Sequence, residues 1–121
     1  MTLVDTSVWV DHLRAGEPAL RDLLLAGQAM IHPLVLGEVS LGNLATRDLV
    51  LGLLADLPAV TVASDAEVLR FIAAGGLFGL DIGYVDAHLL AAARLTPGMT
   101  LWTRDRRLQA AAVSLGLETL K

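Results

Sequence analysis

The sequence predicts an α/β fold in three layers, with a short parallel sheet of about four or five strands and helices on both faces. Short apolar runs typical of strands alternate along the chain with longer segments typical of helices, which is the pattern of βαβ units. The length of 121 residues suits one domain with one hydrophobic core. We therefore expect residues 1–121 to form a single domain.

Five segments have the composition of strands, and helical start and stop signals occur between them. Residues 59–62 are rich in the β-branched side chains that favour strands. Ser64 and Glu67 have the spacing of a capping box at the start of a helix. The expected strands are residues 2–4, 29–31, 59–62, 100–102 and 117–120. The expected helices are residues 7–14, 17–26, 33–42, 46–57, 64–74, 84–95 and 105–115.

Composition restricts the classes of function. The formal net charge is −4, so binding to a polyanion would need a local basic patch or bound cations. The absence of cysteine excludes disulfides and thiolate metal sites, and it fits a cytoplasmic protein. No charge-free stretch reaches the about 20 apolar residues that a membrane span needs, so we expect no contact with a membrane.

Apolar residues make up 55% of the chain, and the mean hydropathy is +0.61, which is high for a small domain. Two interpretations stay open at this point. Either a partner or a second copy covers part of the apolar surface, or the core is simply rich in alanine and leucine.

Two acidic residues follow expected strands directly. Asp5 comes after residues 2–4, and Asp105 comes shortly after residues 100–102. Ligands bind at the carboxyl ends of parallel strands, so the two carboxylates would lie close together if these strands are neighbours. The alternative is that such acids only cap the helices that follow them.

Two further acids, Glu38 and Asp86, have apolar residues three or four positions away on an expected helix. We therefore expect both side chains to face the core, where an unpaired carboxylate is costly. A divalent cation would compensate this charge, and Mg²⁺ and Mn²⁺ prefer oxygen ligands. A set of capping and surface acids is the competing interpretation.

Four motifs occur in order along the chain: LVDTSVWVDHL at residues 3–13, VLGEVSLG around Glu38, DAHLLAAA from Asp86, and LWTRDRRL at residues 101–108. Together they resemble the PIN domain and, more narrowly, the VapC toxins of bacterial toxin–antitoxin pairs. The resemblance covers the whole chain, and the combination of DTSVW with the late TRD is fairly specific.

The resemblance implies a metal-dependent endoribonuclease that hydrolyses RNA phosphodiester bonds with a metal-activated water. The acids that match the family's catalytic and metal-binding positions, for Mg²⁺ or Mn²⁺, are Asp5, Glu38, Asp86 and Asp105. The hydroxyl residues that match the family's supporting positions are Thr6, Ser7 and Thr103. Asp81 competes with Asp86 for the third acidic position, and Asp86 is preferred because a continuous helix follows it.

Arginines surround Asp105, at positions 104, 106 and 107. They are either phosphate-binding groups for RNA or a solvated start to a helix, although positive charge there opposes the helix dipole. The expected RNA-binding residues are Arg104, Arg106 and Arg107. Histidine and tryptophan are expected to be structural, since the histidines have no HxxxH spacing: His12, His32, His88, Trp9 and Trp102.

The resemblance also implies partners. Toxins of this kind form homodimers, and a VapB-type antitoxin silences them in a complex that can be larger than a dimer. The alternative from another class is a non-catalytic PIN-like protein-interaction module. The complete set of four acids argues against that alternative. The sequence does not identify the RNA target.

Overall fold

Within residues 1–120, which the computed structural model describes, four parallel strands form one sheet in the order β2-β1-β3-β4. The strands are β1 (Thr2–Val4), β2 (Ala29–Met30), β3 (Thr100–Trp102) and β4 (Glu118–Thr119). β1 is central, with Leu3 opposite Met30 of β2 and opposite Leu101 of β3.

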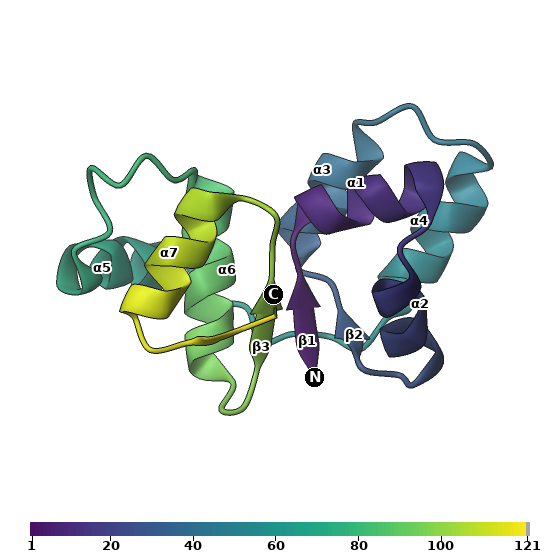
Figure 1. Ribbon diagram of the computed structural model, residues 1–121. Helices are drawn as coiled ribbons and strands as arrows, with labels where there is room; N and C mark the ends of the chain where they lie inside the picture. The colour runs from purple at the N-terminus through teal and green to yellow at the C-terminus, as the bar shows by residue number, and fades with distance from the viewer. Residues whose placement is uncertain (121) are drawn as a thin grey trace.

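In the same part of the chain, seven helices lie in two groups, with the sheet between them (Figure 1). The group beside β1 and β2 is α1 (Thr6–Ala15), α2 (Pro18–Leu25), α3 (Pro33–Ser40) and α4 (Arg47–Ala55). The group beside β3 is α5 (Asp65–Gly75), α6 (Tyr84–Leu95) and α7 (Arg106–Ser114). This arrangement confirms the α/β fold class with a short parallel sheet.

The core lies along the two central strands and the helices that flank them. Leu3, Val4 and Leu101 are completely buried, as expected for parallel strands covered on both sides. In α6, all of residues 87–93 are buried, because alanine and leucine allow close packing around the whole helix. Burial of each leucine side chain contributes roughly 1.5–3 kcal/mol.

Residues 59–62 do not form the strand that their composition predicts. Ala59 makes a single parallel bridge to Ile31 beside β2, and no ladder continues beyond it. Val60 is buried, whereas Thr61 and Val62 are exposed. The segment connects α4 to α5 across the width of the sheet (Figure 1), so it leaves the sheet edge after one residue.

Other local signals match the structure. The capping box before α5 forms, with Ser64 Oγ accepting from Glu67 N at 3.1 Å and Glu67 Oε1 accepting from Ser64 N at 2.9 Å. Among residues 1–120, no helix has both the length and the apolar character needed to cross a membrane.

Candidate metal centre

The carboxyl ends of β1 and β3 lie side by side, because these strands are parallel neighbours with Val4 opposite Trp102. Asp5 follows β1 directly, and its backbone N–H donates to Trp102 O at 2.9 Å. Thr103 follows β3, and its hydroxyl donates to Asp5 Oδ2 at 2.7 Å and accepts from Asp105 N at 3.0 Å. The predicted proximity of the two strand ends is therefore confirmed, and a threonine joins the two acids.

Asp5 is buried, with 5% of its surface exposed. Its backbone occupies the N-cap position of α1, but its side chain accepts no helix N–H. The Asp5 carboxylate instead accepts from two hydroxyls through the same oxygen, from Ser7 at 2.8 Å and from Thr103 at 2.7 Å. The capping interpretation is thus wrong for this side chain, which its neighbours hold at the sheet edge.

Glu38 lies on α3 and is exposed, which corrects the expectation that it faces the core. Of the three apolar residues on which the expectation depended, Val35 is buried, whereas Leu34 and Leu41 are 38% and 87% exposed. Glu38 Oε1 accepts a hydrogen bond of 2.6 Å from Thr6 Oγ1. This bond ties Glu38 to the first residue of α1, one position beyond Asp5.

Asp86 is half-buried near the start of α6, where its Oδ2 accepts from Gly83 N at 3.0 Å. Burial raises the pKa of Asp86, the Gly83 N–H opposes this, and the negative charges of Asp5, Asp105 and Glu38 raise the pKa further. The charges of the other three candidate acids thus act on Asp86.

Asp105 is exposed and caps α7, since its Oδ1 accepts from Arg107 N at 2.8 Å and from Leu108 N at 3.2 Å. The capping interpretation is therefore right for Asp105, although its charge also acts on Asp86. Asp81 lies apart. Its exposed side chain pairs with Arg107 at 3.0 Å, and it is absent from the charges that perturb Asp86. This placement supports Asp86 over Asp81 as the third acid.

The four carboxylates share a pattern of hydrogen bonding. In each, the bonds found within residues 1–120 reach one oxygen and leave the other without a donor. The oxygens without a donor are Asp5 Oδ1, Glu38 Oε2, Asp86 Oδ1 and Asp105 Oδ2. Oxygen donors of this type suit Mg²⁺ and Mn²⁺, and a cation would relieve the mutual repulsion. The donor set therefore fits a divalent metal.

The acids are not already wrapped around a metal position. Over the described range, no group of three or more acidic or histidine side chains stands ready to hold an ion. Glu38 and Asp105 are exposed, so few packing contacts oppose a rotation of either side chain towards Asp5 and Asp86. Metal binding would thus require the two exposed carboxylates to turn inwards.

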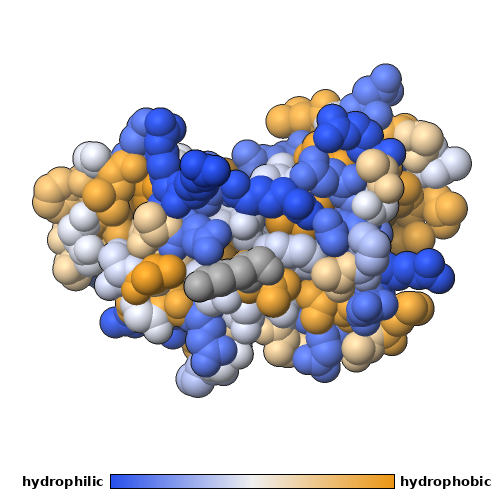
Figure 2. Space-filling view, viewed as in Figure 1, coloured by the Kyte–Doolittle hydropathy of each residue, from blue (hydrophilic) through white to orange (hydrophobic). Residues whose placement is uncertain are grey.

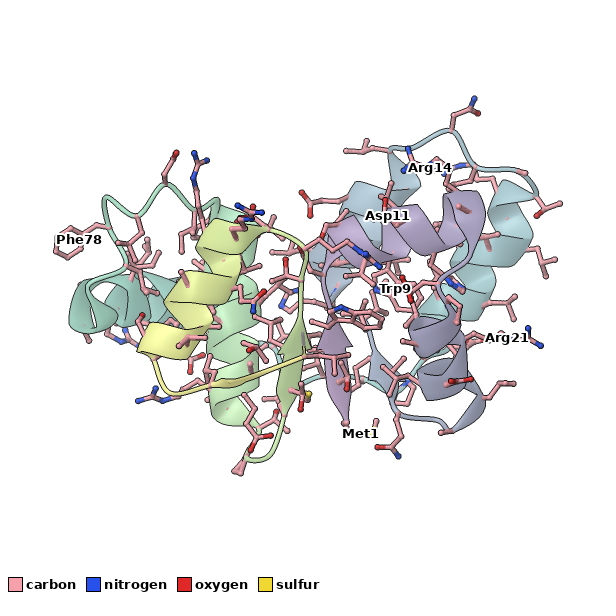
Figure 3. All side chains as sticks on the ribbon, viewed as in Figure 1. Met1, Trp9, Asp11, Arg14, Arg21 and Phe78 are labelled. Carbon is pink, nitrogen blue, oxygen red and sulfur yellow. The ribbon has the colours of Figure 1, made fainter. Side chains whose placement is uncertain are left out.

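Arg104 binds acids beside this centre. Its guanidinium pairs with Asp11 Oδ2 at 3.1 Å and with Glu17 Oε2 at 2.5 Å, and it lies 6.0 Å from the centre of the Trp102 ring. The Arg104 hydrogen bond is the main cause of the lowered pKa of Glu17, followed by the Ala19 N–H. Figure 3 shows Asp11 on α1 near the carboxyl end of β1. Arg104 is therefore held in place by carboxylates.

Arg106 and Arg107 begin α7 and are exposed. Arg107 pairs with Asp81, whereas no ion pair is found for Arg106 within residues 1–120. Hydrophilic residues gather on the upper part of the face in Figure 2, between the regions that Figure 1 labels α7 and α1. Arg106 is therefore better placed than Arg104 to meet an external phosphate.

Two tryptophans and His12, which were expected to be structural, make the following contacts. Trp9 is 1% exposed, and its Nε1 donates to Val4 O at 3.1 Å; Trp102 is also buried. His12 Nδ1 accepts from Glu17 N at 3.0 Å. Sequence reasoning missed the pairing of Arg104 with Asp11 and Glu17, because no local pattern links residues 87 positions apart.

Residues 2–114 match the family model described as the PIN domain. Two curated relatives, both named Ribonuclease VapC32, come from Mycobacterium tuberculosis strains CDC 1551 / Oshkosh and ATCC 25618 / H37Rv. Each is 48% identical over 117 residues, which cover 97% of this chain and 94% of the relative.

Two solved structures share the fold. The crystal structure of PAE2754 from Pyrobaculum aerophilum has a TM-score of 0.61 and 22% identity, over 91% of this chain and 84% of that chain. The structure of FitAB bound to the IR36 DNA fragment has a TM-score of 0.64 and 20% identity, over 99% and 94%. At these identities the likeness establishes the fold alone.

Proposed function

The chain belongs to the PIN-domain family and, within it, to the VapC ribonucleases, and from this premise we propose that it is the toxin of a type II toxin–antitoxin pair. As an endoribonuclease, it hydrolyses RNA phosphodiester bonds with the help of Mg²⁺ or Mn²⁺. The whole chain, residues 1–121, is one PIN domain in this proposal. The observation that supports it most is that Asp5 and Thr103 follow neighbouring strands and are joined by a hydrogen bond, with the charges of Asp5, Asp105 and Glu38 acting on Asp86.

The residues that would hold the metal are Asp5, Glu38, Asp86 and Asp105. When bound, Mg²⁺ or Mn²⁺ supplies a nucleophilic water at neutral pH and shields the charge that develops on the phosphate. The chain offers no cysteine, and its one lysine is the last residue, so side-chain nucleophiles of these types do not compete with this chemistry.

Hydroxyl groups position the carboxylates. Ser7 and Thr103 hold Asp5, and Thr6 holds Glu38, each by donating a hydrogen bond to one carboxylate oxygen. Each of these bonds leaves the second oxygen of the acid available. In this proposal Arg106 binds a phosphate of the RNA at the edge of the centre, because an acidic protein needs local positive charge there.

Cleavage assays test this function. Purified protein should cut RNA in the presence of Mg²⁺ or Mn²⁺, and excess EDTA should stop the cutting. Asp5→Ala should lose cleavage while its circular dichroism spectrum stays that of the wild type. A folded Asp5→Ala variant that cuts RNA as fast as the wild type would exclude the proposed site, and cleavage in EDTA would exclude the metal.

The partners follow from the same family membership. We propose that the chain forms a homodimer and that a VapB-type antitoxin silences it. Large apolar side chains on the surface are available for such contacts, among them Leu25, Leu41 and Phe78, each at least 70% exposed.

Expression of the chain alone should inhibit growth, and co-expression with the neighbouring small reading frame should relieve this inhibition. Harmless expression of folded wild-type protein would contradict the toxin role.

A further inference from the structure

Two buried histidines face each other between the two groups of helices. His32, at the N-cap of α3, is completely buried, and His88 of α6 is 4% exposed. Their ring centroids are 5.7 Å apart, with an interplanar angle of 62°. Each ring has one buried nitrogen without a hydrogen-bond partner in the described part of the chain: His32 Nε2 and His88 Nδ1. The proposed metal chemistry uses neither residue directly.

The hydrogen bonding of His32 fixes its tautomer. Its Nδ1 accepts from Leu34 N at 3.0 Å, so this nitrogen carries no hydrogen. Burial, followed by the effect of the neighbouring His88, lowers the pKa of His32 to about 4, so the ring is neutral at neutral pH. A neutral imidazole holds one hydrogen, which must be on Nε2. His32 Nε2–H is therefore a buried donor that lacks an acceptor.

The hydrogen bonding of His88 leaves its unpartnered nitrogen, Nδ1, able to accept the hydrogen that His32 Nε2 carries. His88 Nε2 lies 3.0 Å from Asp65 Oδ1, which also accepts from the Tyr84 hydroxyl at 2.7 Å. The Tyr84 and His88 bonds lower the pKa of Asp65, so the carboxylate is ionised and can only accept. His88 Nε2 thus carries a hydrogen, and Nδ1, which has no partner, is placed to accept one. A hydrogen on Nδ1 as well would place two unpartnered donors together.

We propose that His32 Nε2–H donates a hydrogen bond to His88 Nδ1 and that this pair ties α3 to α6, which makes both histidines positioning residues for Glu38 and Asp86. The ring centroids are close enough for such a bond, and it would give both unpartnered nitrogens a partner, which matters because a buried polar atom without one is costly. The positioning role rests on the proposed function, whereas the hydrogen bond does not.

The position of the pair explains why it matters for a metal. α3 packs mainly on α1 and α4, and α6 packs on α5 and β3. Glu38 lies on α3 and Asp86 lies on α6. Because these acids belong to different groups of helices, a direct bond between the two helices limits how far the carboxylates move apart. Groups bonded directly to metal ligands typically change metal affinity 10–100-fold, so a pair that acts through the two helices should reach at most the lower end of that range.

Nitrogen-15 NMR tests the hydrogen bond itself. In labelled wild-type protein at neutral pH, we expect both rings as neutral Nε2–H tautomers, with a scalar coupling across the hydrogen bond between His32 Nε2 and His88 Nδ1. A His32 ring that is cationic or protonated on Nδ1 would overturn the pair, and so would the absence of the coupling.

Mn²⁺ titration calorimetry tests the positioning role. In His32→Asn the amide oxygen can still accept from Leu34 N, and in His88→Gln the amide can still donate to Asp65, so each variant removes only the central bond. The titrations are done well below the melting temperature of each variant. We expect each variant to bind Mn²⁺ about tenfold more weakly than the wild type. The double variant should bind no more weakly than the weaker single variant, because both changes remove one interaction.

His12→Asn is the matched control, since His12 Nδ1 also accepts a backbone N–H, from Glu17, but belongs to no such pair. This control should bind Mn²⁺ like the wild type. Equal affinity of His32→Asn, His88→Gln and the wild type would overturn the positioning role. A wild type that binds no Mn²⁺ would reject the proposed function and the positioning role together, and the NMR coupling would then decide the hydrogen bond alone.

Discussion

Asp86 has the least favourable surroundings of the four candidate ligands. Burial and three neighbouring carboxylates raise its pKa above the ordinary value of 3.8. A group whose pKa is raised by folding binds its proton more tightly in the folded state, so its ionised form destabilises the fold above that pKa. At neutral pH and without metal, the ionised Asp86 therefore lowers the free energy of unfolding.

Removal of this charge should separate stability from metal binding. Asp86→Asn keeps an amide oxygen that can accept from Gly83 N, and we expect the metal-free variant to be more stable than the wild type at neutral pH. Mn²⁺ should raise the melting temperature of the wild type but not that of Asp86→Asn, as differential scanning calorimetry can measure.

The competing acid provides the control for this experiment. Asp81→Asn removes the same charge from an exposed residue that is paired with Arg107. It should keep the stabilisation by Mn²⁺. If Asp81→Asn lost the stabilisation by Mn²⁺ and Asp86→Asn kept it, Asp81 rather than Asp86 would be the third metal-binding acid.

The arginines around Asp105 differ in whether carboxylates of the chain already bind them. Arg104 is bound to Asp11 and Glu17, whereas Arg106 is exposed on α7. We expect Arg106→Ala to weaken RNA binding and to reduce the slope of log affinity against log salt by about one unit, because one phosphate contact is lost. Arg104→Ala should change this slope less. Fluorescence anisotropy with a catalytically inactive Asp5→Asn background measures both, and equal slopes for all three proteins would contradict this assignment.

At the scale of elements, α3 begins at a buried histidine whose neutral form is required. The pKa of His32 is about 4 in the folded protein and ordinarily 6.5, so below pH 6.5 the unfolded chain binds a proton that the folded chain does not. Stability should therefore fall as the pH decreases from about 6.5 to about 4, by on the order of 3 kcal/mol from this residue.

Urea unfolding at several pH values tests this dependence. His32→Asn has no such group, so the stability of the wild type relative to His32→Asn should decrease as the pH falls through this window. The nearby Asp65 is present in both proteins, and its contribution largely cancels in the difference. His88 is also present in both, but His32→Asn removes its neighbouring ring. A difference that stays constant from pH 7 to pH 4 would show that His32 titrates normally.

Elements with local signals were predictable from the sequence. Pro18 starts α2, and the capping box of Ser64 and Glu67 starts α5, as their residue types indicate. Residues 59–62 were wrongly predicted as a strand, because β-branched composition does not determine whether a neighbouring strand edge is accessible. Glu38 was placed in the core because apolar spacing cannot distinguish buried leucines from exposed ones.

The candidate site depends on contacts that local sequence does not contain. The juxtaposition of Asp5 and Asp105 follows from the strand order, in which β1 and β3 are neighbours although nearly the whole chain separates them. The resemblance to the PIN family suggested which acids form the site, but not how they are held. The hydroxyl bridge of Thr103 and the capture of Arg104 by Asp11 and Glu17 became evident only in three dimensions.

At the scale of the whole molecule, the carboxyl ends of β1 and β3 lie between the two groups of helices (Figure 1). In this acidic chain the charges of Asp5, Glu38 and Asp105 raise the pKa of the fourth candidate carboxylate, Asp86. The fold holds these groups together through hydroxyl and backbone hydrogen bonds that leave their negative charges in place. Their mutual repulsion is then a cost of the metal-free protein, and a divalent cation at the centre would remove it.

Isothermal titration calorimetry with Mn²⁺ tests this claim most directly, with Asp5→Asn as the test variant. Asp48→Asn, which removes the same charge from an exposed residue of α4, is the control. The wild type and Asp48→Asn should bind Mn²⁺ with equal affinity, and Asp5→Asn should show little or no binding heat while remaining folded. Binding by Asp5→Asn that equals the wild type, or no binding by the wild type, would contradict a metal centre at the ends of β1 and β3.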